Sequence, residues 1–256
     1  MIEKREFYYW PSGQNRTLHI YLPPGYYDSD ERYPVMYFFD GHNLFHDYEA
    51  TYGKSWGLES FLDAWGKKII IAGMECAHEG NLRLAEYSPY DKRWRGEYVR
   101  GMGEETFEWI IHDVKPFIDG NFRTYGHREA TGIGGSSMGG LMSIYGVIVH
   151  NDVFSKAACV SPGMFWNIGR LRSDLARSCI NSDTRIYMSW GEIEAGKAAY
   201  NGNPAYDTRE ARSIRKFERE LQARGASTYL HFQYGGRHCE ADWEKQNPVY
   251  MNFLWY

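Results

Sequence analysis

The sequence predicts an α/β protein of three layers, in which a mostly parallel central sheet carries helices on both faces. Short apolar strands alternate with helix-length segments along the chain, which is the pattern of that class. The clearest strands, 35–39 and 69–74, are apolar throughout, as strands buried on both faces are. A Gly-x-Ser-x-Gly pentapeptide at 135–139 lies where such a strand passes into a helix. The 256 residues fit one large domain, 1–256, because no change in composition marks a boundary.

The remaining elements follow the same alternation. Residues 7–10 and 17–21 are expected to be the opening strands. Apolar side chains at 107, 110, 111, 114, 117 and 118 follow helical spacing, and Pro116 is expected to kink that helix near its end. Residues 88–103, rich in Arg, Tyr and Trp, are long enough for a loop that overhangs a site. The later elements are strands at 156–160, 185–190 and 229–233, a helix at 210–223, and a closing helix at 240–255 that is interrupted at Pro248.

Composition excludes several classes of partner. A net charge of −4 and a pI near 6.1 argue against nucleic acid and against anionic membranes. The mean hydropathy of −0.59, with no apolar run near the ~20 residues of a membrane span, predicts a soluble protein. Residues 1–6 lack the apolar stretch of a signal peptide, and the 4 cysteines show no Cys-x-x-Cys spacing. Both observations lead us to expect a cytoplasmic protein with free thiols. Nothing in the sequence indicates an oligomeric state.

The pentapeptide at 135–139 is the clearest chemical signal. Glycines on both sides of Ser137 allow the sharp turn that lifts a serine hydroxyl clear of a sheet, as in a nucleophile elbow. Residues 130–134 are small and apolar, and residues 140–149 are apolar on all sides, so the strand–turn–helix context is present. We therefore expect Ser137 to be a nucleophile.

A serine nucleophile needs a base to take its proton and a carboxylate to orient that base. His231 lies inside a predicted strand, whereas His238 follows the last strand in a Gly-Gly-Arg-His loop that can swing its imidazole toward Ser137. His238 is therefore the expected base. The acid is expected just after the strand 185–190, where the candidates are Glu192, Glu194 and, further on, Asp207.

Ester hydrolysis also needs N–H donors aimed at the developing oxyanion. The backbone N–H of Met138, directly after the nucleophile, is one expected donor. The second is expected from the loop after strand 35–39, where Gly41 lets the chain turn close to a substrate and the amide of His42 is best placed. His42 and His46 are four residues apart, but they lie in a loop without further ligands, so neither a metal nor a cofactor is expected.

Several segments between about residue 17 and Trp243 share the pattern of one known family. Strand 33–39 is followed by Asp-Gly-His-Asn-Leu-Phe at 40–45. The other segments are Asn-Leu-Arg-Leu-Ala-Glu-Tyr-Ser-Pro at 81–89, Asn-Phe-Arg-Thr at 121–124 with Arg128, the glycine-rich block 134–140, Ser161-Pro162, the turn 191–194, and 235–238 with Trp243. On these segments the chain resembles the esterase-D-like esterases of the α/β-hydrolase superfamily. These include carbohydrate feruloyl and acetyl esterases, enterochelin esterases, S-formylglutathione hydrolases and mycolyltransferases. Ser136 departs from the pattern, since many relatives carry a histidine or another larger residue there.

The resemblance implies an α/β-hydrolase fold and a serine esterase that works through an acyl-enzyme without a cofactor. Gly191 and Glu194 resemble the family's Gly-x-x-acid turn, which favours Glu194 over Glu192 as the acid. The first expected substrate is an acetyl or aromatic acyl ester of a carbohydrate, because the segment 88–103 and the pair Phe165 and Trp166 can form an aromatic platform. The alternatives are a siderophore trilactone, for which Arg83, Arg93 and Arg95 offer positive charge, and an acyltransferase on the same fold. The expected substrate-binding residues are Asp40, Gly41, Arg83 and Trp166.

Overall fold

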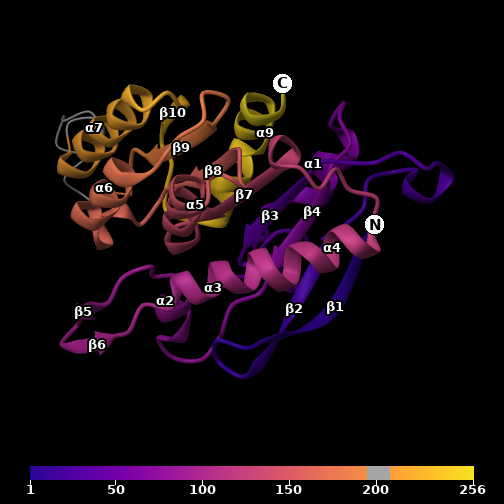
Figure 1. The fold of residues 1–256 in the computed structure, drawn as a ribbon, viewed down its shortest axis with the longest axis horizontal. Helices are drawn as coiled ribbons and strands as arrows, with labels where there is room; N and C mark the ends of the chain where they lie inside the picture. The colour runs from indigo at the N-terminus through magenta and orange to yellow at the C-terminus, as the bar shows by residue number, and fades with distance from the viewer. Residues whose placement is uncertain (195–207) are drawn as a thin grey trace.

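The central element is a sheet of 8 strands in the order β1-β2-β4-β3-β7-β8-β9-β10 (Figure 1). The computed structural model describes residues 1–194 and 208–256, apart from the side chain of Trp166. Six strands run parallel, and the hairpin at one edge joins the sheet antiparallel. This confirms the predicted mostly parallel sheet. The strands are β1 (Ile2–Tyr9), β2 (Gln14–Tyr21), β3 (Val35–Phe39), β4 (Ile70–Met74), β7 (Thr131–Ser136), β8 (Lys156–Val160), β9 (Arg185–Gly191) and β10 (Ser227–Gln233).

Side chains on the two faces of the sheet form two separate cores. In β3, Val35, Tyr37 and Phe39 belong to one buried cluster, and Met36 and Phe38 belong to the other, as the alternation of a strand requires. Helices cover both clusters, which explains why the strand is apolar throughout. The first cluster packs under α3 (Gly103–Trp109), α4 (Lys115–Asn121), α5 (Met138–Val149), α6 (Ile168–Arg177) and α7 (Arg209–Ala223), and the second under α1 (Leu58–Ala64) and α9 (Asn247–Trp255).

Two predicted helices lie in the segments 103–121 and 240–255, and each segment is divided into shorter elements in the structure. In the segment 103–121 a π-helical turn, Ile110–Val114, separates α3 from α4, and Pro116 lies directly after that turn, in the first turn of α4. The closing segment consists of α8 (Glu240–Trp243), a 3₁₀ turn and α9. Pro248 therefore lies in the first turn of α9 and does not interrupt a helix. Within the described residues, no helix is both long and apolar enough to cross a membrane.

The segment 88–103 forms a hairpin of β5 (Lys92–Trp94) and β6 (Glu97–Val99), which Figure 1 shows projecting beside α2 (Leu82–Glu86). Its two-residue turn has positive φ at both positions, 50° at Arg95 and 88° at Gly96. That is the backbone of the tight turns whose twist matches a β-hairpin. The segment is thus a hairpin with regular pairing.

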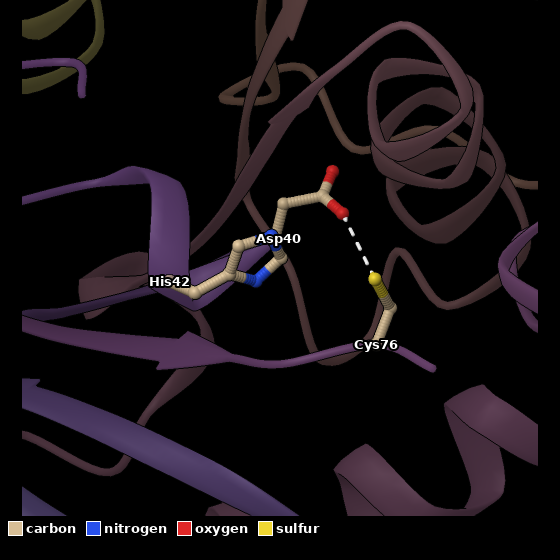
Figure 2. A group of neighbouring side chains, drawn as sticks. All are labelled: Asp40, His42 and Cys76. Carbon is tan, nitrogen blue, oxygen red and sulfur yellow. Dashed lines mark hydrogen bonds between the residues drawn. The ribbon is translucent and has the colours of Figure 1, made fainter. Parts of the chain in front are cut away.

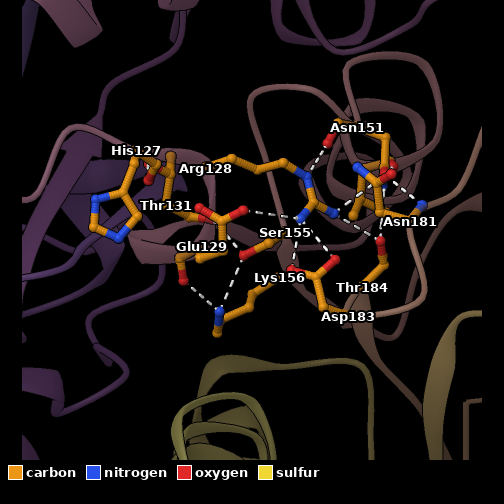
Figure 3. A network of polar contacts seen from close by, with 11 residues as sticks. His127, Arg128, Glu129, Thr131, Asn151, Ser155, Lys156, Asn181, Asp183 and Thr184 are labelled. Atoms are coloured by element: carbon orange, nitrogen blue, oxygen red, sulfur yellow. Dashed lines mark hydrogen bonds and ion pairs between the residues drawn. The ribbon is translucent and has the colours of Figure 1, made fainter.

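A polar network fixes the ends of the central strands that lie opposite the site (Figure 3). The Arg128 guanidinium, just before β7, donates to both carboxylate oxygens of Asp183 at 2.8 and 2.7 Å and to the Thr184 hydroxyl at 2.9 Å. It also donates to the Asn151 carbonyl. These contacts join the chain before β7, the turn after α5 and the chain before β9. The network holds the amino ends of the strands in register, and their carboxyl ends carry the site.

Candidate active site

The loops that follow the parallel strands enclose a cavity of about 520 Å³. In open α/β sheets, ligands bind at the carboxyl ends of the strands. Ser137 follows β7 and His238 follows β10, and both line the cavity. Its wall is completed by the end of β7, by residues after β3 and β4, and by α8 with the residue before it: Asp40, His42, Asn43, Thr51, Tyr52, Cys76, Ala77, His78, Gly80, Arg83, Ser136, Cys239, Glu240 and Trp243.

Ser137 occupies a sharp turn between β7 and α5. Its backbone has φ 55° and ψ −116°, a region that a residue with a side chain rarely adopts. A Cβ on Gly135 would lie 2.8 Å from the carbonyl carbon of Gly139. A Cβ on Gly139 would lie 2.9 Å from the Cβ of Phe39. The pentapeptide therefore needs both glycines because strand and helix approach each other too closely for any side chain.

Glu194, in the turn after β9, binds the imidazole of His238. One carboxylate oxygen lies 3.0 Å from Nδ1 of His238. The other accepts the Ser161 hydroxyl at 2.5 Å and the backbone N–H of Gly191 at 2.8 Å. The side chain of Glu194 is 2% exposed, whereas that of His238 is 43% exposed. A buried carboxylate with three donors thus holds a histidine whose ring reaches the cavity.

The other two candidate acids do not share this position. The Glu192 carboxylate accepts the backbone N–H of Gly235 at 2.8 Å, so it supports the loop before His238 rather than the imidazole itself. Asp207 lies outside the described residues. His231 lies in β10, where it stacks with Tyr187 and Tyr229.

Two residues to which the sequence analysis gave no role complete the surroundings of Glu194. The Trp243 indole donates to the Ser161 hydroxyl at 3.0 Å, and its ring stands edge-on to His238 with centroids 4.9 Å apart. Ser161 therefore links the indole to the carboxylate of Glu194. Both residues belong to segments that carry the family resemblance, which was the available signal. Their contacts depend on the fold and could not be read from the sequence.

The loop that carries His238 is held by Asp242, whose side chain is 2% exposed. Asp242 accepts the backbone N–H of Arg237 at 3.0 Å, its Nε at 2.9 Å and the Lys245 ammonium at 2.6 Å. Burial alone would raise the pKa of this carboxyl, but the hydrogen bonds from Lys245 and Arg237 hold it well below its usual range. The residue after His238, Cys239, lies near the same carboxylate, with Sγ 3.6 Å from its oxygen.

The backbone amides expected to bind an oxyanion begin α5 and a 3₁₀ turn after β3. Among the hydrogen bonds of the described residues, none uses the N–H of Met138 or of His42. The His42 side chain is buried, and burial lowers its pKa to about 4. Gly41 lies against the neighbouring strand β4. A Cβ there would lie 2.5 Å from the carbonyl carbon of Gly73 in β4, and Gly41 is not among the residues that line the cavity.

Asp40 and Arg83 line the cavity as a pair. Nε and Nη2 of Arg83 donate to the two oxygens of Asp40, each at 2.7 Å. Burial would raise the pKa of Asp40, but the charge of Arg83 lowers it. The arginine is therefore already neutralised by a carboxylate.

The described members of the expected aromatic platform are absent from the residues that line this cavity. None of the described residues of 88–103 lines it. The ring of Phe165 packs edge-on against Trp190, with centroids 5.7 Å apart. Trp166 belongs to the 3₁₀ turn Met164–Trp166, and its side chain lies outside the described part of the structure. Among the described residues, Trp243 and Tyr52 bring tryptophan and tyrosine rings to the cavity, and Tyr52 is 81% exposed.

A family model described as "Putative esterase" matches residues 12–249. The chain belongs to that esterase family. Among curated proteins, it is 27% identical over 184 residues to the uncharacterized protein YbbA of Bacillus subtilis, a match that covers 70% of this chain and 69% of YbbA. The family confirms that this esterase is an ester-hydrolysing enzyme.

Solved structures show the same fold. An IroE-like serine hydrolase from Shewanella oneidensis aligns with a TM-score of 0.75 at 17% identity, over 99% of this chain and 79% of that one. A ferulic acid esterase aligns with a TM-score of 0.65 at 17% identity, over 99% of this chain and 96% of that one. These matches confirm the α/β-hydrolase architecture expected for this esterase.

Proposed function

We propose that this esterase cleaves carboxylic esters through an acyl-enzyme formed on Ser137. The observation that carries the proposal is the hydrogen bond between Glu194 and Nδ1 of His238 beside the elbow that presents Ser137. A histidine held at Nδ1 by a buried carboxylate keeps Nε2 for the proton of a nucleophile. The three groups come from the ends of β7, β9 and β10, and Ser137 and His238 share one cavity.

In the acylation step, Oγ of Ser137 bonds to the ester carbonyl carbon while His238 takes the hydroxyl proton. The carbonyl oxygen becomes an oxyanion, and we assign its binding to the amides of Met138 and His42. When the tetrahedral intermediate collapses, the bond to the alcohol oxygen breaks, and His238 returns the proton to that oxygen. Water then repeats the sequence on the acyl-enzyme and releases the acid. No cofactor takes part in these steps.

The substrate we propose is an acetyl or aromatic acyl ester of a carbohydrate. Tyr52 at the cavity rim is 81% exposed, and an exposed tyrosine ring offers a surface on which a sugar or an aryl group can stack. Asn43, Thr51 and His78 supply polar groups on the same wall. The similarity in fold to a ferulic acid esterase agrees with this class of substrate.

A siderophore trilactone is a weaker candidate substrate than a sugar ester, because the arginines expected to bind it are not free at the cavity. It was favoured by three arginines, but Arg83 is paired with Asp40, and Arg93 and Arg95 lie in or beside the β5–β6 turn, away from the residues that line the cavity. Acyl transfer uses the same acyl-enzyme, with an alcohol in place of water.

Turnover of three substrate classes tests this assignment: sugar acetates, sugar feruloyl esters and a catecholate trilactone, each with and without an acceptor alcohol. We expect kcat/KM to be highest for a sugar ester and free acid to be the main product. A preference for the trilactone would overturn the substrate class, and a predominant transfer product would overturn hydrolysis. A serine-directed sulfonyl fluoride should abolish turnover and add one mass label, on a peptide that contains Ser137. Persistent activity after labelling would contradict the serine mechanism.

A further inference from the structure

The imidazole of His42 has one free nitrogen in a buried position. The residue is 5% exposed, and its Nε2 lies 2.9 Å from the Thr51 hydroxyl. Its Nδ1 is buried and has no hydrogen-bond partner. A buried polar atom without a partner carries a desolvation cost, so its presence calls for an explanation. With the ring oriented by Thr51, Nδ1 can offer a lone pair to an electrophile.

Two further metal-ligating side chains face His42. Glu75 and His78 follow β4, which pairs with β3 in the sheet, so the two loops leave the sheet side by side. One ligand atom from each of His42, Glu75 and His78 lies within 4.8 Å of the other two. The imidazole rings of His42 and His78 have centroids 4.5 Å apart. These two side chains come from the loop after β4, so the loop that carries His42 gives no sign of them in the sequence.

Glu75 is itself held by a second residue, as metal-binding carboxylates commonly are. Nε2 of His19, whose ring is 1% exposed, lies 2.8 Å from a carboxylate oxygen of Glu75. A histidine oriented through its other nitrogen and a carboxylate fixed by a hydrogen bond are the outer contacts that tune metal sites. Both features are found around His42 and Glu75.

A second group of ligands around His42 is less suitable. Asp40 and Cys76 lie near the same imidazole (Figure 2). Both oxygens of Asp40 are bonded to Arg83, whose positive charge would repel a cation. The Cys76 thiol donates to Asp40 at 3.3 Å, so it is engaged as a protonated donor. Asp40 and Cys76 are better explained as cavity-lining residues whose polar groups already bond to each other and to Arg83.

We propose that His42, Glu75 and His78 bind a divalent transition metal ion of the zinc class. Two imidazole nitrogens and one carboxylate oxygen are a donor set that Zn²⁺ takes with a fourth position open. Bonds of about 2.1 Å in a tetrahedron would place the donors about 3.4 Å apart. His78 is exposed, so its side chain can move to close that difference. His42 and His78 line the cavity that Ser137 also lines, whereas Glu75 does not.

Zinc binding to the metal-free full-length protein, measured by isothermal titration calorimetry, tests the proposal. We expect one equivalent of Zn²⁺ to bind, with an affinity at least tenfold weaker in His78→Ala and in Glu75→Gln. The matched control is His112→Ala. His112 is an exposed histidine that also faces a glutamate, Glu108, at 3.2 Å, and we expect its removal to leave the affinity unchanged. The melting temperature should rise with Zn²⁺ in the wild type and in the control, but not in His78→Ala.

Cobalt substitution identifies the ligands independently. Co²⁺ held by two imidazoles and a carboxylate should give visible bands of a four- or five-coordinate ion without sulfur-to-cobalt charge transfer. A strong charge-transfer band would place the ion on a cysteine and overturn the proposal. Equal zinc affinity in the wild type and His78→Ala, or the lack of saturable binding below millimolar Zn²⁺, would also overturn it. Because His78 is exposed, its variant should retain the circular dichroism spectrum of the wild type.

Discussion

Replacing Glu194 by glutamine tests the proposed acid with the smallest change in shape. The carboxylate receives only donors: Ser161 and Gly191 on one oxygen and His238 on the other. Glutamine keeps one acceptor oxygen and adds an NH₂ group that must face a donor. If the amide nitrogen turned toward Ser161 and Gly191, two buried donors would lose their acceptor. Each unsatisfied donor would cost about 1–3 kcal/mol of stability. The favoured orientation therefore points the NH₂ at Nδ1 of His238.

In that orientation Nδ1 has to accept a hydrogen bond, which moves the imidazole proton to Nε2. His238 then cannot take the proton of Ser137, and we expect kcat to fall by about 10³–10⁴-fold, as in triads whose imidazole is held in the wrong tautomer. Stability should change much less, because the bonds from Ser161 and Gly191 survive.

The assay is steady-state hydrolysis of an aryl acetate together with a thermal melt. Glu192→Gln is the matched control, because its carboxylate accepts one exposed bond, from the N–H of Gly235. We expect the control to lose less than about threefold in kcat. If both variants lost activity equally, or if Glu194→Gln kept more than about a tenth of kcat, the role would pass to a residue such as Asp207.

Three further predictions concern the nucleophile, Gly41 and Lys156. Ser137→Ala should lower kcat about 10⁴-fold or more while the fold persists, whereas Ser136→Ala should keep most activity; reversed kinetics would mean that the elbow is misassigned. Gly41→Ala should lower the free energy of unfolding in denaturant titrations, because its Cβ would meet the backbone of Gly73 at 2.5 Å, and an unchanged midpoint would contradict this contact. Burial lowers the pKa of Lys156 from 10.5 to about 8, so between these pH values the unfolded chain binds the extra proton and the free energy of unfolding should rise with pH. Lys156→Met should remove that rise, and a difference from the wild type that stays constant between pH 7.5 and 10 would refute the assignment.

The sequence predicts strands well where burial fixes every residue. The strand expected at 35–39 is β3, Val35–Phe39, because all five side chains lie in a core. The opening strands are longer than expected, since β1 begins at Ile2 and β2 at Gln14. All of their extra residues except Ile2 are polar, and they belong to an edge hairpin, where one face meets water and apolar periodicity is lost. Hydrogen bonding to a neighbouring strand, which a sequence pattern does not record, extends them.

Some residues of the candidate site can be predicted from local sequence, and others come together only in the fold. Ser137 and His238 carry local signals, a glycine-flanked turn and a glycine-rich loop, and the structure brings both to one cavity. The cluster of His42 with Glu75 and His78 has no local signal, because its members meet only when β3 pairs with β4. Over 88–103 the sequence predicts an overhanging loop rather than a hairpin, because composition does not reveal strand pairing. Gly96 in its turn was the one available hint.

Strain in the backbone is concentrated where the site is built. Of the four non-glycine residues with positive φ in the described chain, Asp40, Ser137 and Ser161 directly follow β3, β7 and β8. Such a conformation costs roughly 1–2 kcal/mol per residue. Each strained residue is held by its own N–H: Asp40 donates to the Tyr87 hydroxyl at 3.1 Å, Ser137 to the Val160 carbonyl at 3.0 Å, and Ser161 to the Ser189 hydroxyl at 3.0 Å. The acceptors lie in or beside the buried core, so the core imposes the three turns. The sheet itself therefore positions three parts of the site before any substrate arrives: the loop after β3, the proposed nucleophile and the hydroxyl that binds Glu194.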